Sequence, residues 1–368
     1  MKYLFITLIF ICLLSFSINA ETVPFEEVYD DIYQNSGLDK VNDSLDDKTK
    51  EYLERLKISP DDINGYKNFD IKNIFSVLFE NINEMFKTPF SIMYKTLAVI
   101  FLSVIIKNIT DKKNNVYEYI CTLAVAAVCL SPVINAIFRA GVVLQAGSVF
   151  IMAFIPVYAG ILIANMRAGT AASVNGMLFA ASQGVNFLSV NVIVPVLNMF
   201  LALSVASSVT SENTLSSIIS TFKKTVIWVL GIFMVVFTGV LTIRSSVASA
   251  ADSVGAKTAK FFISSFVPVV GGTVSEALGS IMGCMNILKA TAGIYSILAI
   301  IFIFAPIIIE LSLMRLILAI CSGAAEAFEC GNIKNMTDGI ASAITLLITI
   351  LVITALVFMV SLTVVVAL

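Results

Sequence analysis

Long apolar runs separated by short polar stretches fill the chain from position 90 to its end. The runs are continuous rather than alternating, which favours membrane helices over the strands of a β-barrel. Most are near the 20 or so residues that a helix needs to cross a bilayer. The clear runs are residues 90–106, 117–138, 142–164, 185–208, 226–243, 294–320 and 339–367. Two less apolar stretches, 168–183 and 257–283, add to them. We therefore predict an all-α polytopic membrane bundle with seven or eight transmembrane helices.

The region before these runs has two parts. Residues 1–20 have the pattern of a secretory signal peptide, with Lys2 before an apolar stretch that ends near Ala20. An uncleaved signal anchor is the alternative, and either would place residue 21 outside the cytoplasm. Residues 21–88 form an acidic segment with short helical patterns. We expect it to cover the mouth of the bundle, lie on the membrane or meet a partner, ahead of a multispan domain over 89–368.

Composition supports the membrane class and narrows the chemistry. The chain is 58% hydrophobic and 13% charged, with a mean hydropathy of +0.95, whereas soluble domains are about half apolar and a quarter charged. It contains no histidine, the commonest general base and metal ligand. No phosphate-binding glycine loop or paired-carboxylate metal motif is present. We therefore predict no enzymatic activity, no catalytic, cofactor or metal site, and no nucleic-acid partner.

The stretch from 257 to 283 combines apolar character with residues that interrupt helices. Proline kinks a helix and paired glycines loosen one. After this point small residues recur every fourth position, a pattern that lets membrane helices approach closely. We expect an interrupted helix packed inside the bundle, with the other helices around it. Its candidate functional positions are Lys260, Pro268, Gly271, Gly272 and Glu276.

Part of this stretch resembles an earlier one. Residues 154–157 (FIPV) resemble residues 266–269 (FVPV), 112 positions later, so that Pro156 corresponds to Pro268. At an offset of 111 positions, Pro195 falls on Pro306. We predict an internal repeat with proline-broken helices. Inverted copies would follow if each copy crosses the membrane an odd number of times, as in many transporters. An even number would make the copies parallel.

Glu310 is the sharpest single candidate, since it lies one turn after Pro306 in an apolar run. A charge near the middle of a bilayer costs roughly 2.5–3.5 kcal/mol, so it should face other helices or water. Arg315 lies about 140° further around the helix and is poorly placed to pair with it. Glu310 is therefore either part of an ion, proton or polar pathway, or a paired charge that holds helices together. Glu276 follows the Gly–Gly break. It is either a functional charge, with Lys260, Arg244 or Arg167 as a possible partner, or a residue at the interfacial end of a broken helix.

Residues 257–283 also resemble the signature region of the stage III sporulation protein AE family. The similarity lies in Thr258–Phe261 (TAKF), in residues 266–272 (FVPVVGG) and in Ser275 followed by an acidic residue. Lys257 and Glu276 stand where the family has Arg and Asp, so the charges are kept. The order of signal peptide, soluble segment and multispan region matches as well.

The resemblance implies a multi-pass protein of the mother-cell membrane that surrounds the forespore. It also implies partners from the same operon, a ring-forming subunit and an ATPase, and a forespore membrane protein, together with membrane lipid. Three hypotheses follow: a membrane subunit of a channel or secretion-like complex, a self-contained secondary transporter of a small solute or ion, or a structural scaffold. An intramembrane enzyme has no recognisable catalytic dyad to support it.

Overall fold

The structure is a computed structural model that describes residues 33–34, 36–56, 58–59, 71–80, 82–109, 116–188, 191, 193–210, 213–266 and 271–367. These residues are almost entirely helical and contain no strand. The elements are α3 (Leu38–Asp43), α4 (Asp47–Arg55), α5 (Ile71–Glu80), α6 (Ile82–Ile109), α7 (Val116–Ala164), α8 (Ala168–Leu188), α9 (Val194–Thr210), α10 (Asn213–Phe266), α11 (Gly271–Ala327) and α12 (Gly331–Ala367). The predicted all-α membrane bundle is confirmed. The signal peptide predicted over 1–20 lies outside the described residues.

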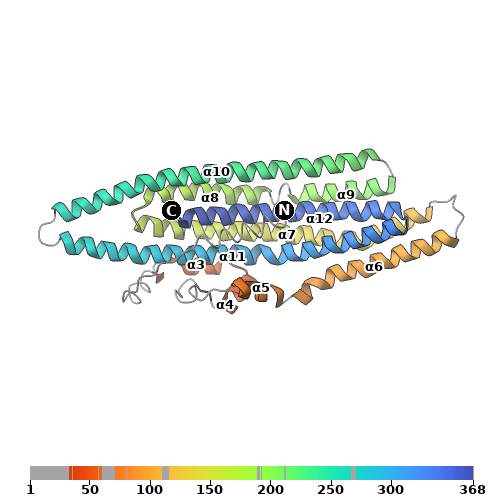
Figure 1. Cartoon of the computed structure of the whole chain (residues 1–368), viewed down its shortest axis with the longest axis horizontal. Coiled ribbons are helices and arrows are strands. Elements are labelled where there is room, and N and C mark those ends of the chain that lie inside the picture. The colour runs from red at the N-terminus through yellow and green to blue at the C-terminus, as the bar shows by residue number, and fades with distance from the viewer. Residues whose placement is uncertain are drawn as a thin grey trace.

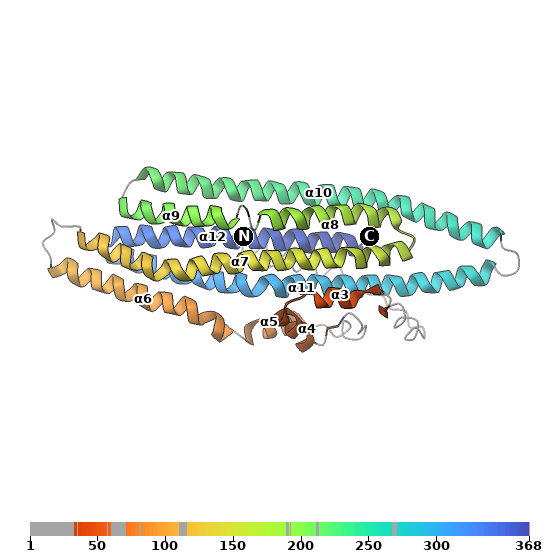
Figure 2. The same ribbon diagram turned by 180° about the vertical axis from the view of Figure 1, so that it is seen from behind.

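The long helices lie side by side in an elongated, antiparallel bundle (Figure 1). α10 runs along one edge and α6 along the other, while α8 and α9 follow one another in a single row in both views (Figures 1 and 2). Consecutive rods run in opposite directions. Five described helical segments are long and apolar enough to cross a membrane: Met85–Ile109, Val116–Ala164, Ser220–Gly255, Met282–Ala327 and Gly331–Val364.

Several rods are longer than a bilayer is thick. α7 has 49 residues, and at about 1.5 Å per residue it extends for about 73 Å, against about 30 Å of hydrocarbon. The sequence analysis placed a turn near 139–141 and a break at Pro156, and both are wrong. α7 is continuous through Pro132 and Pro156, because a proline removes only one helical hydrogen bond and close helix packing tolerates that loss.

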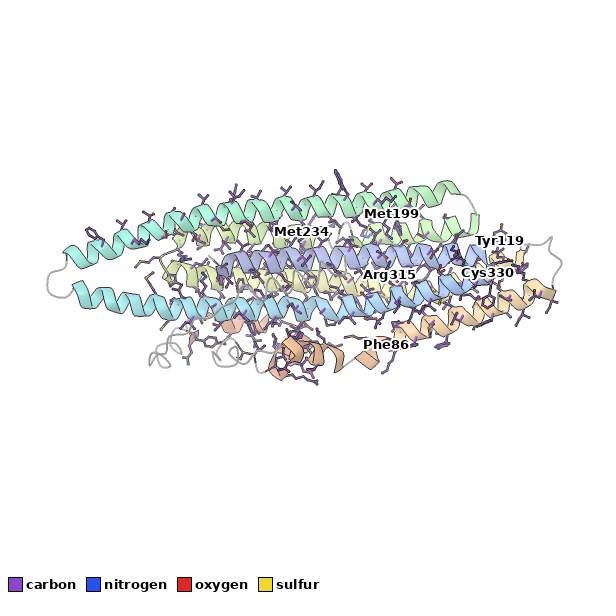
Figure 3. All side chains as sticks on the ribbon, viewed as in Figure 1. Phe86, Tyr119, Met199, Met234, Arg315 and Cys330 are labelled. Carbon is purple, nitrogen blue, oxygen red and sulfur yellow. The ribbon has the colours of Figure 1, made fainter. Side chains whose placement is uncertain are left out.

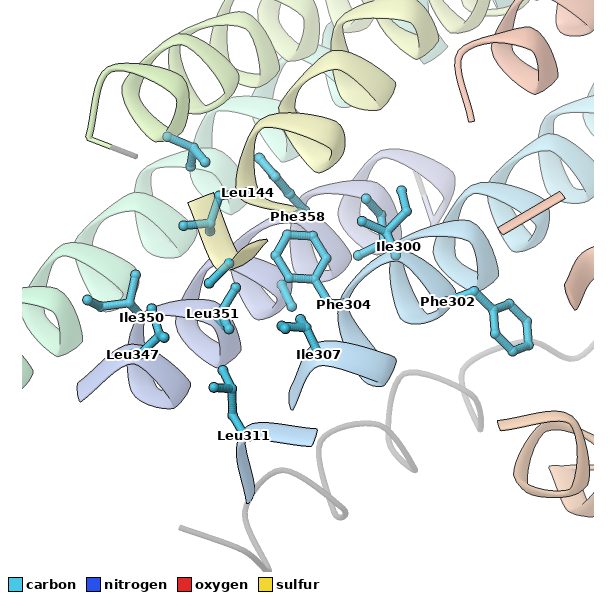
Figure 4. Packing of buried hydrophobic residues seen from close by; sticks show 14 of the residues in the cluster. Leu144, Ile300, Phe302, Phe304, Ile307, Leu311, Leu347, Ile350, Leu351 and Phe358 are labelled. Carbon is cyan, nitrogen blue, oxygen red and sulfur yellow. The ribbon is translucent and has the colours of Figure 1, made fainter. Parts of the chain in front are cut away.

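The packed interior lies between α7, α11 and α12, which bury most of their mutual faces (Figure 4). The Phe304 and Phe358 rings meet edge to face, with centroids 6.3 Å apart. A side chain at Gly147 would place its Cβ 2.6 Å from the Phe304 ring. A glycine there lets α7 approach α11 closely, as small residues do between membrane helices.

The stretch from 257 to 283 is not the packed centre of the bundle. α10 ends at Phe266 and α11 begins at Gly271, so the predicted interruption of the helix is present. However, this end of the α10–α11 pair projects beyond α8 and α12 in both views (Figures 1 and 2). Val254 and Phe261 are 64% and 65% exposed. Pro268 and the Gly271–Gly272 pair predicted the break correctly, but the small-residue spacing did not determine which helices surround it.

The described part of the acidic N-terminal segment packs on the side of the bundle. Tyr295 of α11 donates a 2.6 Å hydrogen bond from its hydroxyl to Asn42 Oδ1. The rings of Tyr52 in α4 and Phe302 in α11 lie 5.5 Å apart. α3 and α4 are therefore held against the apolar rods. α6 begins at Ile82 and continues through Pro89, so the predicted boundary at residue 88 lies within a helix.

Two tight turns are closed by residues other than glycine. Met166 (φ 59°) follows α7 and Glu329 (φ 55°) follows α11, both in the left-handed region. Arg167 N donates to Leu162 O at 2.9 Å, and Cys330 N donates to Ala325 O at 2.8 Å. These bonds are the signature of a Schellman motif, which ends a helix by satisfying its last carbonyls. Glycine is the usual residue at this position, so its absence from both turns meant that the sequence did not predict where these helices end.

Helix directions bear on the repeat hypothesis. α7 and α10 run the same way, and α8–α9 and α11 run the opposite way (Figure 1). The helices that contain or lead into the aligned segments therefore point in the same direction, although residues 267–269 themselves lie outside the described part of the chain. If the chain is duplicated, its two copies are parallel rather than inverted.

Candidate functional site

An ion pair joins the middle of α7 to α11. Arg139 Nη1 donates to Glu310 Oε2 at 2.8 Å, and Nη2 donates to Oε1 at 2.6 Å. The two parallel bonds match the fork of the guanidinium to both oxygens of the carboxylate. The Glu310 side chain is 12% exposed and that of Arg139 is 49% exposed. Glu310 thus faces another helix, as expected, and is paired rather than free.

The pair can be located along the bundle from two neighbouring contacts. Thr96 of α6 lies 3.5 Å from Cys129 of α7. Because these helices are antiparallel, Arg139, ten residues later in α7, is level with about position 86 of α6. Lys107 of α6 reaches Glu329, just past α11. α11 runs parallel to α6, so Glu310 is level with about position 88. The pair therefore lies near the start of the α6 candidate span at Met85, not at its middle.

Arg315 and Pro306 have separate surroundings. Arg315 Nε donates to Thr345 Oγ1 of α12 at 2.8 Å, so it does not pair with Glu310, as predicted. Its place on α11, on the side toward α12, is visible in Figure 3. Pro306 lies inside α11, which continues past it to Ala327. The proline marks no interruption in α11.

The remaining predicted positions do not form one site. Gly271 and Gly272 begin α11, and Lys260 lies near the end of α10. Pro268 lies outside the described residues, as do the side chains of Lys260 and Glu276. Pro156 lies within α7, far along the chain from both. The structure therefore brings Glu310 to a partner that the sequence analysis had not named, Arg139.

A second polar group surrounds the end of α6. Lys107 Nζ lies 3.2 Å from Glu329 Oε2, and Glu118 Oε1 accepts a 3.1 Å hydrogen bond from Asn332 N. These contacts join α6, α7 and the α11–α12 turn. Cys330 is buried in the same turn (Figure 3). Burial raises the pKa of its thiol, opposed in part by its contact with Ser103. No cluster of three His, Cys, Asp or Glu side chains suited to a metal occurs among the described residues.

A third polar group, which the sequence analysis missed as a unit, lies at the α7–α8 turn. Asn165 and Thr170 are 2% and 0% exposed, and Lys289 of α11 is 7% exposed. The sequence analysis named Arg167 only as a possible partner of Glu276. The sequence gives little indication that these residues belong to one group, because 119 positions separate Thr170 from Lys289.

Together these features define a polytopic α-helical membrane protein whose interior carboxylate is paired across helices. The chain belongs to the stage III sporulation protein AE family, whose model matches residues 56–368. It is 24% identical over 309 residues to "Stage III sporulation protein AE" of Bacillus subtilis (strain 168), covering 83% of this chain and 77% of that protein. No solved structure matches it. It is thus a membrane protein of a sporulation family, and that family is not a known enzyme family.

Proposed function

We propose that this chain is a multispan membrane subunit of a channel or secretion-like complex that links mother cell and forespore. Membership of the sporulation family is the observation that carries this proposal. In it, the protein lies in the mother-cell membrane that surrounds the forespore and is required for forespore development. Its partners are a ring-forming subunit and an ATPase of the same operon, and a forespore membrane protein.

The length of the bundle supports a role in assembly. If α6 crosses the bilayer, the Arg139–Glu310 level is one membrane boundary. α7 continues for 25 residues past Arg139, or about 37 Å. That half, with α3–α5 along its side, would extend into the intermembrane space and present a surface to partners. Lys107, Lys112 and Lys113 would place the α6–α7 connection on the cytoplasmic side, in agreement with the positive-inside bias.

The test is capture of the complex from sporulating cells. A tagged chain should co-purify with the ring-forming subunit and the ATPase, and its deletion should stop forespore development after engulfment. Charge-reversal variants at exposed positions of α4, such as Lys48→Glu and Glu54→Lys, should lose partners while the membrane-inserted chain remains. The proposal is overturned if the chain purifies alone and the deletion strain still forms heat-resistant spores.

A secondary transporter is the alternative, and Glu310 discriminates between the two. A transporter that uses this carboxylate would lose flux in Glu310→Gln while its folding and assembly persist. The two hydrogen bonds from Arg139 favour a clamp between helices. We therefore expect Glu310→Gln to impair the protein by lowering the stability of its fold rather than by blocking transport.

A further inference from the structure

We propose that the α7–α8 turn and α11 form a binding site for a small monocarboxylate, lined by Asn165, Arg167, Thr170 and Lys289. The proposal does not depend on the channel role. It rests on a group of polar side chains that are buried and that the described part of the chain does not satisfy.

The unmet hydrogen-bonding capacity is concentrated at one place. Asn165 Nδ2 and Oδ1 and Arg167 Nη1 are buried without a hydrogen-bond partner among the described residues, whereas the Thr170 hydroxyl lies beside the Asp252 carboxylate. Buried polar groups are nearly always paired, because an unpaired one loses its bonds to water without replacement. Three such atoms within three residues of one turn therefore indicate a ligand.

Lys289 adds a second cation to the site. It projects from α11, is 7% exposed, and has neither a hydrogen bond nor an ion pair among the described residues. The Arg139–Glu310 pair sets the register of the antiparallel α7 and α11, so Lys289, 21 residues before Glu310, is level with about position 160 of α7. It therefore lies within about two helical turns of Arg167 along the bundle, and the charge of Arg167 acts on it. Position 276 lies 13 residues earlier on α11, about 20 Å along the axis, so Glu276 is not at this level. Buried charges of one sign require an anion or a specific partner.

The charge balance selects a monoanion. Asp252 of α10 is close to Arg167, but its carboxylate is already used. Its Oδ1 accepts from Gly169 N at 3.1 Å and its Oδ2 from Thr170 N at 2.6 Å. It thus caps the first turn of α8 from another helix, a role that suits a carboxylate. Arg167, Lys289 and Asp252 together carry one net positive charge. A carboxylate would neutralise it, whereas a doubly charged phosphate would be repelled by Asp252.

The chemistry of the lining suits a carboxylate as well. A guanidinium, an ammonium, an amide and a hydroxyl together offer more donors than acceptors, and charge-assisted hydrogen bonds to carboxylate oxygens are the strongest of this kind. The lining side chains other than Arg167 are at most 7% exposed, so a ligand at this site has to be small. The site lies where the α10–α11 pair begins to project past the rest of the bundle (Figure 1).

The experiment uses the full chain in lipid nanodiscs, with sodium acetate as the probe and acetamide as its neutral isostere. Added acetate should raise the unfolding temperature of the chain up to a plateau. The chain should also broaden the NMR signal of carbon-13-labelled acetate, and this broadening should saturate as the acetate concentration rises. Acetamide, and sodium chloride at equal ionic strength, should do neither. Lys289→Met and Arg167→Gln should each weaken the apparent acetate affinity about tenfold or more, as expected for loss of a charge-assisted hydrogen bond.

Lys223→Met is the matched control, since Lys223 is a half-buried lysine of α10 outside this site and bonded to Ser342. It should bind acetate as the unmodified chain does. Without acetate, Lys289→Met should be at least as stable as the unmodified chain, because it removes a buried unpaired charge. The proposal is overturned if acetate and acetamide act alike, or if Lys289→Met retains the full response to acetate.

Discussion

Arg139 and Glu310 lie 171 positions apart in the sequence and form a two-point ion pair between α7 and α11. The pair is level with positions 86–88 of α6. It therefore fixes the register of α7 against α11 close to the end of the α6 candidate span. Because Glu310 is nearly buried and Arg139 is half exposed, the carboxylate depends on the pair more than the guanidinium does.

We predict that Glu310→Gln lowers the free energy of unfolding by about 1–3 kcal/mol, less than for a fully buried pair because water reaches Arg139. The amide turns a donor toward the guanidinium and keeps only one good acceptor. Arg139→Met should cost a similar amount by leaving the carboxylate unpaired. Unfolding of the purified chain in nanodiscs would measure both.

The double variant Arg139→Met with Glu310→Met should recover much of the loss, since no charge is left unpaired. Arg315→Gln serves as the control, because Arg315 bonds to Thr345 instead. Additive effects of the two single variants would mean that the residues do not interact. A Glu310→Gln chain of unchanged stability that no longer supports sporulation would favour the transport hypothesis.

We also predict which side of the membrane each turn faces. With native cysteines replaced, Ala168→Cys and Ser253→Cys should react with an impermeant maleimide from the side on which Glu54→Cys reacts. Gly331→Cys should react only from the other side. A continuous α7 requires this result, since Ala168 then lies a whole rod away from Val116. Reaction of Ala168→Cys from the side of Gly331→Cys would restore the turn near 139–141.

The pattern of apolar residues predicts the class of this protein but not the number of its transmembrane helices. Hydropathy correctly identified the all-α membrane class, and the 3.6-residue geometry correctly separated Arg315 from Glu310. Hydropathy could not give the number of transmembrane helices, because an apolar stretch of 49 residues fits either one long helix or two short ones. Arg139 fell between the predicted runs 117–138 and 142–164 and was not considered as a partner of Glu310. Only the structure brings it to its partner.

The turns and the glycines show the same limit. Met166 and Glu329 have left-handed backbone conformations, which glycine usually adopts at the end of a helix. Because neither position is a glycine, the sequence did not show at which residue each helix ends. Pro156 was read as a break because proline removes a helical donor, yet neighbouring helices stabilise α7 there. Local sequence preferences show which conformations a segment can adopt, whereas packing against distant helices determines which of them it adopts.

Close packing at Gly147 gives a third prediction. Gly147→Ala should destabilise the chain by about 1–3 kcal/mol, because its Cβ would meet the buried Phe304 ring at 2.6 Å and overpacking displaces neighbours. Gly160→Ala, on the same helix with open space around it, should instead be neutral or stabilise by up to about 1 kcal/mol. Equal effects of the two changes on the unfolding temperature would contradict the packing of α7 on α11.

Thiol reactivity gives a fourth prediction. The five described cysteines, Cys121, Cys129, Cys284, Cys321 and Cys330, are all buried. In a Cys12→Ser background the native chain should therefore resist maleimide until it unfolds. Glu329→Cys should react at once, because the Glu329 side chain is 85% exposed. Rapid labelling without Glu329→Cys would mean that the turn after α11 is open.

Cys330 should also contribute to alkaline sensitivity. Burial raises the pKa of its thiol in the folded chain, whereas in the unfolded chain it ionises near its ordinary value of about 8.5. The unfolded state then binds fewer protons above that pH. The stability due to this group is therefore fully present below about pH 8.5 and decreases as the pH rises further. With the other cysteines replaced by alanine, unfolding from pH 7 to 10 should show a steeper loss for the chain with Cys330 than for Cys330→Ala. Parallel curves would mean that the thiol reaches water in the folded chain.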